Sequence, residues 1–450
     1  MAKSIISLAP YPSVARFIRP YPLPFFIGKW LLLTALIACC VGSASALFLV
    51  SLDWATSWRE ANPWIITLLP IGGLLIGLLY YYLGRSVEGG NNLLLDNIHR
   101  PDSIIPFRMA PLVLLGTLGT HLFGGSAGRE GTALQMGGAI ADQFTRLFQL
   151  RPRDRRLVLI AGISAGFASV FGTPLAGAVF GLEVFFIGRI SYEAILPSFL
   201  AAMGADYVTR WWHVGHTHYH ITMVPALTPE YALYAGLAGV AFGGAAVGFG
   251  ELTHTIGRLF KKWIPFPPLR PLIGGAFVAG AVWAIGTTRY IGLGVPVIVQ
   301  SFEGPLAPYD FLLKLLFTAL TLGAGFKGGE VTPLFFIGAT LGNALAYWLP
   351  LPIPLLAGMG FVAVFAGAAN TPLACILMAL ELFGVACGPY VAIACVVAYL
   401  CSGHRSIYGS QVIGQPKHLL WSRHQGQRFA QLRTQPNQPS PPAPDEKPTL

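Results

Sequence analysis

The chain has 450 residues, of which 54% are hydrophobic and only 11% are charged, and its mean hydropathy is +0.61. Soluble domains usually contain about 25% charged residues, so this composition excludes an ordinary soluble protein and predicts a polytopic α-helical membrane protein. The net charge is +10. Many basic residues lie between apolar runs, as in the RPRDRR stretch at 151–156, which is typical of cytoplasmic loops and makes nucleic-acid binding an unnecessary explanation.

The predicted elements, in chain order, begin with a basic segment over residues 1–29. It lacks the apolar core and cleavage site of a signal peptide, so we expect it to be cytoplasmic. Helices are expected over the apolar runs of residues 31–52, 64–82, 111–127, 157–186, 231–249, 272–286, 311–325, 355–383 and 391–401. Residues 416–450 are polar and rich in Pro and Gln, which predicts a disordered cytoplasmic tail.

Glycine and proline interrupt these runs. The chain contains 53 Gly and 35 Pro, and several runs are shorter than the about 20 residues that span a bilayer. Irregular backbone at membrane depth is tolerated only inside protein or along a wet cavity, so broken helices indicate the interior of a transporter or channel.

An internal repeat divides the predicted membrane domain, residues 30–415. Residues 171–185 read FGTPLAGAVFGLEVF and residues 369–383 read ANTPLACILMALELF, an offset of 198, while EGTALQMGGAIA from Glu130 matches EVTPLFFIGATL from Glu330 at an offset of 200. The halves are about 30–210 and 225–415. Transporter repeats often hold their substrate at the repeat interface. The sequence leaves open whether the halves are parallel or inverted.

Each half contains a Gly-rich loop with a glutamate that opens an apolar helix: GGSAGREG with Glu130 and GAGFKGGE with Glu330. Glycines allow backbone N–H groups to converge, and a helix N-terminus adds partial positive charge, so these loops predict an anion site made of neutral dipoles. An ionised Glu130 would occupy such a site itself and leave it when protonated. This would couple anion movement to proton movement; the structural alternative is an ordinary first-turn acid.

The motifs GREG, GGEVTP, TPLAG…E, TPLA…E and SGHRSIYGSQ resemble those of the CLC anion channels and transporters, in the same order from about residue 30 to 415. The resemblance implies an all-α fold of many tilted and broken helices in two inverted repeats. It also implies a homodimer with one pathway per subunit. Glu130 matches the gating glutamate of the family, and Tyr408 matches the tyrosine that lines the central anion site.

Three departures resemble the fluoride/proton antiporter branch of that family. Asn91 and Asn92, in GGNNLLLDN, replace a serine loop; GREGP reads GREGT; and the second-half loop carries Glu330 and Thr332. A fourth departure is Val184, which stands where many chloride/proton exchangers have an internal proton-transfer glutamate. Glu330 is therefore the candidate for an assisting carboxylate.

The sequence thus predicts an inner-membrane, multi-pass antiporter that exports fluoride in exchange for protons, with both termini cytoplasmic. Hydroxyl, amide and backbone N–H donors suit a small, strongly hydrated anion; the expected lining is Asn91, Asn92, Gly131, Thr332 and Tyr408. Helix capping by the asparagines or Thr332, and packing by Tyr408, are the structural alternatives. Rival functions are a chloride-selective transporter or passive channel, an intramembrane enzyme, and a cation carrier. We expect no enzyme, cofactor or metal site.

Other polar residues have structural explanations. Glu183 and Glu381 are expected to be hydrogen-bonded acids near helix ends, and His121 a core or pore-adjacent histidine. Arg129 and Lys327 either attract anions or pair with the neighbouring glutamates. The alternating histidines 216, 218 and 220 are expected in an exposed loop without a metal, and the six cysteines are expected to be packing residues.

Overall fold

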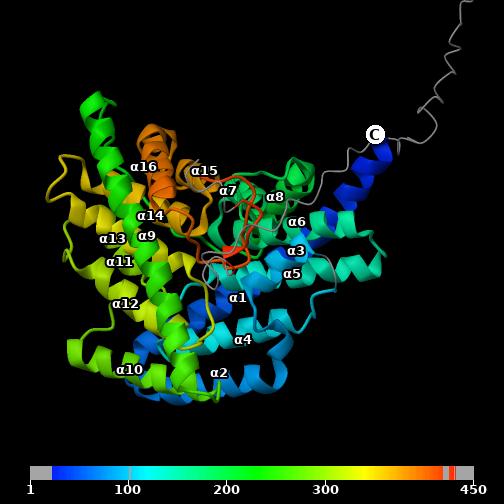
Figure 1. Cartoon of the computed structure of the whole chain (residues 1–450), viewed down its shortest axis with the longest axis horizontal. Coiled ribbons are helices and arrows are strands. Elements are labelled where there is room, and N and C mark those ends of the chain that lie inside the picture. Colours follow the sequence, from blue (N-terminus) through cyan, green and yellow to red (C-terminus); the bar gives the residue numbers. More distant parts are fainter. Residues whose placement is uncertain (1–22, 101–102, 419–424, 430, 432–450) are drawn as a thin grey trace, which may run out of the picture.

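The computed structural model describes residues 23–100, 103–418, 425–429 and 431. The basic residues Lys3, Arg16 and Arg19 of the predicted N-terminal segment, and most of the predicted tail, lie outside these residues. The described part is almost entirely helical (Figure 1). Its helices are α1 (Leu23–Ala61), α2 (Leu69–Leu83), α3 (Asn91–His99), α4 (Met109–Leu122), α5 (Glu130–Leu147), α6 (Pro152–Phe171), α7 (Pro174–Glu183), α8 (Ile195–Trp211), α9 (Pro229–Trp263), α10 (Leu269–Ile285), α11 (Val295–Glu303), α12 (Asp310–Gly323), α13 (Val331–Leu345), α14 (Ile353–Ala369), α15 (Pro372–Phe383) and α16 (Gly388–Cys401).

Two short strands, β1 (Phe186–Ile187) and β2 (Val412–Ile413), pair in parallel and attach the segment after α16 to the segment between α7 and α8. Short 3-10 turns occur at Pro63–Leu68, Arg85–Val87, Tyr192–Ala194 and Val385–Cys387. Within the predicted tail, Phe429 is buried and Arg428 pairs with Asp96 of α3, its Nη1 lying 2.8 Å from Oδ1.

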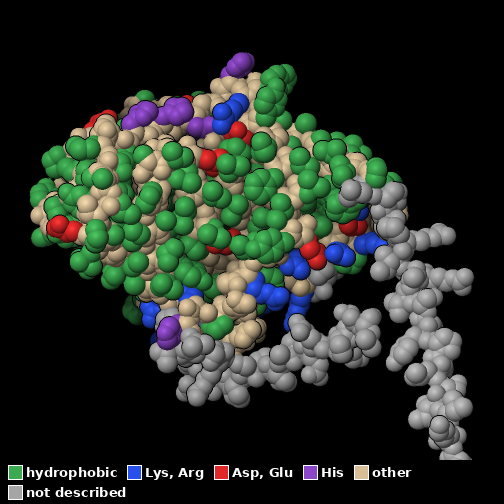
Figure 2. Space-filling model, turned by 90° about the horizontal axis from the view of Figure 1, so that it is seen from above, with side chains coloured by type: hydrophobic (Ala, Val, Ile, Leu, Met, Phe, Trp, Pro, Cys, Tyr) green, Lys and Arg blue, Asp and Glu red, His purple; other side chains and the backbone are tan. Residues whose placement is uncertain are grey.

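A broad band of hydrophobic side chains crosses the face of the molecule shown in Figure 2. Lys and Arg gather along one edge of this band, and most of the visible histidines lie along the opposite edge. In the described part of the chain, three helical stretches are long and apolar enough to cross a membrane, Pro24–Ala61, Pro63–Leu83 and Pro229–Trp263, while other apolar helices are only 10–17 residues long. Short helices of this kind need neighbours to complete the crossing, as expected for a transporter interior.

The two longest predicted runs do not form single helices. Residues 157–186 divide into α6 and α7 at Gly172, whose φ is 71°, and residues 355–383 divide into α14 and α15 at Asn370, whose φ is 59°. In both runs the left-handed residue is followed by Thr-Pro, and the proline begins the next helix. A left-handed cap ends a helix and an N-terminal proline starts one, so the TPLA repeat marks a helix break.

The two halves are inverted repeats, and they hold each other reciprocally. Glu183, at the end of α7, accepts hydrogen bonds from the N–H groups of Leu373 and Ala374 (3.2 and 3.0 Å), at the start of α15. Glu381 of α15 accepts from Leu175 and Ala176 of α7, both at 2.9 Å. Each carboxylate therefore satisfies free N–H groups of the other half, which confirms the structural role predicted for these acids.

Candidate functional site

Glu130 is fully buried at the first turn of α5, at the boundary between the two halves. Its Oε2 accepts hydrogen bonds from the backbone N–H groups of Arg129 (3.2 Å) and Thr332 (3.0 Å), and its Oε1 accepts from the Thr332 hydroxyl at 2.5 Å. The Arg129 Nε lies 3.6 Å from Oε1. The carboxylate of one half is thus bound at the N-terminus of α13, in the other half. Such a position suits an anion.

Two glycines let the repeat-related loops approach this closely. Gly128 and Gly329 form an antiparallel bridge, with N–H···O distances of 2.6 and 2.8 Å. A Cβ on Gly128 would lie 2.9 Å from both the Gly329 oxygen and Glu130 Oε2, and a Cβ on Gly329 would lie 2.6 Å from the nitrogen of Gly131. Any side chain here would separate the loops and break the carboxylate's bonds.

An inner cavity of about 160 Å³ lies on one side of the bridged loops, lined by α3, the first turns of α5, the loop before α13 and the loop after α16. Three atoms around it are buried and have no hydrogen-bond partner among the described residues: Asn91 Oδ1, Glu330 Oε2 and the Tyr408 hydroxyl. A Cβ on Gly131 would lie 3.0 Å from Asn91 Nδ2 and 3.5 Å from Glu330 Oε2. The structure therefore brings Asn91, Gly131, Glu330 and Tyr408 close to one another.

Asn91 and Asn92 are neighbours in the chain but have different contacts. Helix α3 is preceded by Gly90, with φ 56°, and neither asparagine caps it through a side-chain hydrogen bond. The Oδ1 of Asn92 accepts from the backbone N–H of Ser410 at 3.0 Å. Asn92 therefore positions the loop that carries Tyr408, whereas the unpartnered amide oxygen belongs to Asn91. Thr332 likewise makes no capping bond to its own helix; its hydroxyl goes to Glu130.

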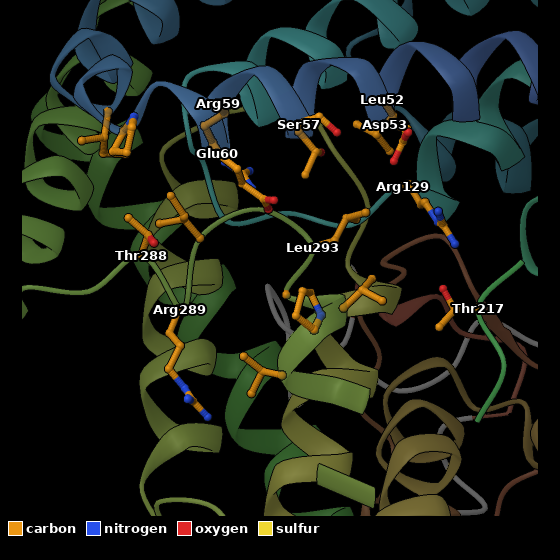
Figure 3. A pocket seen from close by; sticks show the side chains of 18 of the residues that line it. Leu52, Asp53, Ser57, Arg59, Glu60, Arg129, Thr217, Thr288, Arg289 and Leu293 are labelled. Atoms are coloured by element: carbon orange, nitrogen blue, oxygen red, sulfur yellow. The ribbon is translucent and has the colours of Figure 1, made fainter. Parts of the chain in front are cut away.

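A larger vestibule of about 660 Å³ lies on the other side of Arg129 (Figure 3). Its wall includes the end of α1, with Asp53, Arg59 and Glu60, together with Thr217 and the loop before α11. The guanidinium of Arg59 is largely buried; it donates to the His121 carbonyl (3.3 Å) and to Glu60 (3.1 Å). The charged side chains that line the vestibule are three arginines, Arg59, Arg129 and Arg289, and two carboxylates, Asp53 and Glu60.

Sequence reasoning missed Arg59 and Lys314. The Lys314 side chain is fully buried, and its Nζ donates to the carbonyls of Tyr290 (3.2 Å) and Gly292 (2.7 Å). These hydrogen bonds fix the loop before α11, which lines the vestibule. A Cβ on Gly292, whose φ is 58°, would strike Arg59. The available signal was a basic residue within or at the end of an apolar run, in SWREANPW and FLLKLLF.

A family model described as voltage gated chloride channel matches residues 72–403. This chain belongs to that family. A chloride/fluoride channel protein of Pseudomonas syringae pv. tomato is 56% identical to it over 90% of this chain and 91% of the relative. An H(+)/Cl(-) exchange transporter of Vibrio cholerae is 27% identical, over 84% and 86%. A crystal structure of a CLC-type fluoride/proton antiporter matches with a TM-score of 0.84 at 36% identity, over 88% of this chain and 99% of that one.

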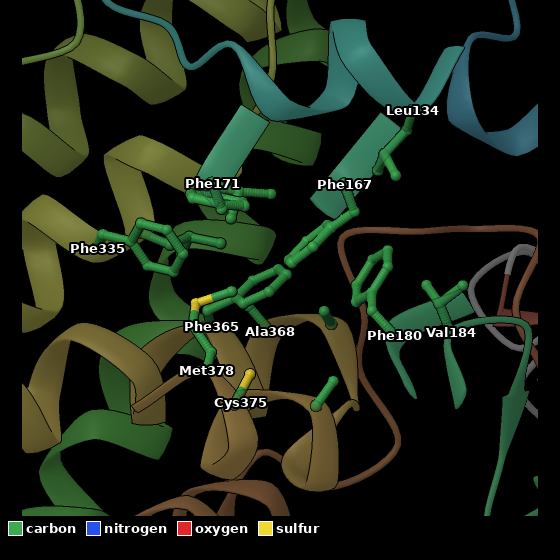
Figure 4. Close-up of a cluster of buried hydrophobic side chains, with 14 of the residues drawn as sticks. Leu134, Phe167, Phe171, Phe180, Val184, Phe335, Phe365, Ala368, Cys375 and Met378 are labelled. Atoms are coloured by element: carbon green, nitrogen blue, oxygen red, sulfur yellow. The ribbon is translucent and has the colours of Figure 1, made fainter. Parts of the chain in front are cut away.

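In this family member the surroundings of Val184 are apolar (Figure 4). Val184, Phe180 and Leu134 line a narrow gap together with Tyr408, and the rings of Phe180 and Phe167 stack with their centroids 4.3 Å apart. None of the residues lining this gap is ionisable except Tyr408. The lining of this gap therefore contains no carboxylate, whereas Glu330 lines the inner cavity.

The remaining polar residues considered in the sequence, His121, Arg129 and Lys327, have the following contacts. His121 is fully buried, with Nε2 3.5 Å from the Gly128 carbonyl, so it contacts the loop that precedes Glu130. Arg129 pairs with Glu130, but Lys327 makes no ion pair with Glu330; its Nζ lies 4.1 Å from the centroid of the Tyr80 ring.

The histidine-rich loop was predicted to be exposed, and for His216 this is wrong. Its side chain is only 11% exposed because the ring packs against Gly172 at the end of α6. Among the described residues, no group of three or more His, Cys, Asp or Glu side chains is arranged to hold a metal ion.

Proposed function

We propose that this protein exports fluoride in exchange for protons, with Glu130 as gate and proton carrier. The observation that carries the proposal is the position of its carboxylate, which occupies an anion-sized site of two N–H groups and one hydroxyl between the vestibule and the inner cavity. The named activity of the fluoride/proton antiporter that it resembles at 36% identity supports the choice of ion and of exchange.

The cycle follows from the hydrogen bonds. While Glu130 is ionised, it holds the three donors and closes the path. A proton reaching it removes the charge that those donors stabilise, so the side chain leaves and an anion takes its place at Arg129 and Thr332. Loss of the proton returns the carboxylate and expels the anion. One side chain thereby alternates between proton and anion.

The inner cavity supplies the remaining groups. Tyr408 offers a free hydroxyl and Asn91 an amide, which replace part of the hydration shell of fluoride. Glu330, whose Oε2 has no partner in the described structure, assists by passing protons between the cavity and Glu130. We further propose a homodimer with one pathway per subunit in the inner membrane, with cytoplasmic termini; the basic edge of the molecule in Figure 2 supports this orientation.

The test is flux from liposomes loaded with fluoride, recorded with a fluoride electrode together with external pH, and repeated with chloride. The proposal expects fluoride release much faster than chloride release and proton movement in the opposite direction. Glu130→Gln removes the titrating group, so anion flux in this variant should no longer drive protons. Glu60→Gln is the matched control, because this carboxylate lines the vestibule away from the gate.

Other outcomes identify the rivals. Equal or faster chloride movement with coupled protons would indicate a chloride exchanger, and anion flux without proton movement in the unmodified protein would indicate a passive channel. Loss of cation binding in Glu130→Gln and Glu330→Gln would indicate a cation carrier.

A further inference from the structure

Lys327 is a cation in the wall of the inner cavity that the mechanism above does not use. Its stem packs against α4, where a Cβ on Gly116 would lie 3.0 Å from Lys327 Cβ. Its ammonium lies over the Tyr80 ring, 4.1 Å from the centroid. Within the described residues, no carboxylate lies within ion-pair distance of the ammonium and no acceptor takes a hydrogen bond from it.

This arrangement leaves the ammonium available to a ligand. An aromatic face attracts a cation without taking any of its N–H donors, so the Lys327 ammonium is oriented while its donors stay free. The charged groups that act on it are Glu88, which lines the same cavity, and Lys261 at the end of α9. Both of these side chains are exposed. A cation without a carboxylate partner in a small cavity would raise the local concentration of anions.

The segment that contains Lys327 also reaches the gate. Lys327 stands three residues before Glu330 and five before Thr332, so one short stretch runs from the cavity wall to the donors that hold Glu130. The paired loop of the first half contributes Arg129, which lines the vestibule instead. Each of the two bridged loops therefore contributes one cation, and the two cations serve opposite sides of the gate.

We propose that Lys327, seated on Tyr80, is an anion-recruiting residue that binds a small inorganic anion at the inner cavity before it reaches Asn91 and Tyr408. This inference rests on the proposed function. It assigns to Lys327 a role in capturing the anion, distinct from that of Glu130, which couples the anion to protons.

The first test compares fluoride flux in liposomes for the unmodified protein, Lys327→Met and Lys262→Met over a range of fluoride concentrations. Lys262 is exposed at the end of the same helix as Lys261 and does not line the cavity, so Lys262→Met removes an equal charge as a control. Lys327→Met should raise the half-saturating fluoride concentration by about 3–10-fold and change the maximal rate by less than about twofold. Added sulfate salt should affect this variant less than the unmodified protein.

The second test separates charge from packing within one protein. Lys327→Cys is treated with a positively or a negatively charged methanethiosulfonate reagent, and the unmodified protein, with its own cysteines, receives the same treatment. The positive reagent should restore a low half-saturating concentration and the negative reagent should raise it further. Equal effects of the two reagents, or a Lys327→Met variant that loses maximal rate at unchanged half-saturation, would overturn the inference. Failure of the proposed function is distinguishable, because it would appear as absent fluoride/proton coupling in the unmodified protein.

Discussion

Thr332 provides two of the three hydrogen bonds that hold Glu130, one from its backbone N–H and one from its hydroxyl. The backbone donor is present with any residue except proline, so the side chain at this position decides whether the carboxylate receives its third hydrogen bond. A hydrogen bond to a charged group is worth about 1.5–3 kcal/mol, a factor of about ten or more in occupancy. In the proposed cycle, the Thr332 hydroxyl therefore controls how often the ionised Glu130 side chain leaves its site.

Thr332→Val keeps the shape of the side chain and removes only the hydroxyl. The ionised Glu130 should then leave its site about ten times more often, so anions should slip past without a proton. Measured in liposomes, the ratio of fluoride released to protons taken up should rise at least about twofold. Thr332→Ser retains the hydroxyl and should keep the ratio of the unmodified protein. If serine and valine gave the same ratio, the hydroxyl would have no part in the gate.

At this scale the sequence predicts the residues that belong to local motifs. Glu130, Glu330, Thr332 and Tyr408 stand in short Gly- or Ser-containing loops whose chemistry can be read directly. The separation of Asn91 from Asn92 could not be predicted, because it depends on Ser410, a residue more than 300 positions away. Contacts between residues so far apart in the chain cannot be predicted from the spacing of residues within a local motif.

Among the elements, α7 and α15 are joined by the two reciprocal carboxylates. Glu183 is the more buried of the pair, and each accepts two backbone N–H bonds from the opposite helix. Because these N–H groups have no partner within their own helix, loss of an acceptor leaves them unsatisfied. The pair therefore fixes the contact between the two halves.

Glu183→Ala should lower the free energy of unfolding by about 2–4 kcal/mol, and Glu381→Ala, at the more exposed site, by about 1–2 kcal/mol. Glu183→Gln keeps one acceptor oxygen, so it should lower the free energy of unfolding by about half as much as Glu183→Ala. The double alanine variant should lose less than the sum, since both carboxylates hold the same helix pair. Thermal unfolding in detergent checks this. Unchanged melting of Glu183→Ala would contradict the role of these carboxylates.

The ends of these helices could not be predicted from the hydrophobic pattern alone. Hydrophobicity predicts one run over 157–186, but Gly172 and Pro174 divide it, and Asn370 with Pro372 divides its repeat partner. The proline and the glycine were visible in the sequence. What was not visible is that a buried break is tolerated, because its free N–H groups are satisfied by a carboxylate from the other half.

On the scale of the whole molecule, residues 212–228 join the two halves across the vestibule side, outside the membrane-spanning helices. Thr217 of this loop lines the vestibule near Arg129 (Figure 3). One residue before it, His216 packs on Gly172, and its Nε2 lies 4.0 Å from Asp206 of α8. The loop is thus held against the first half by a buried imidazole that has no hydrogen bond in the described structure.

This imidazole makes the loop sensitive to acid. Burial, with the nearby Arg129 and Arg210 guanidinium groups, lowers the pKa of His216 to about 4, from an ordinary value of 6.5. As the pH falls, His216 therefore takes up a proton at a higher pH in the unfolded chain than in the folded protein. The stability that neutral His216 contributes is fully present above pH 6.5 and is lost as the pH falls toward 4, by up to about 3 kcal/mol.

Melting temperatures between pH 7.5 and pH 4 should show this loss. His216→Gln removes the titrating group, so its melting temperature should fall less than that of the unmodified protein as the pH is lowered. His218 is an exposed histidine of the same loop, and the melting temperature of His218→Gln should follow that of the unmodified protein. Asp206 favours the protonated ring, so Asp206→Asn should steepen the loss. Parallel pH profiles for His216→Gln and the unmodified protein would mean that acid weakens the fold elsewhere, and that this loop joins the halves without responding to pH.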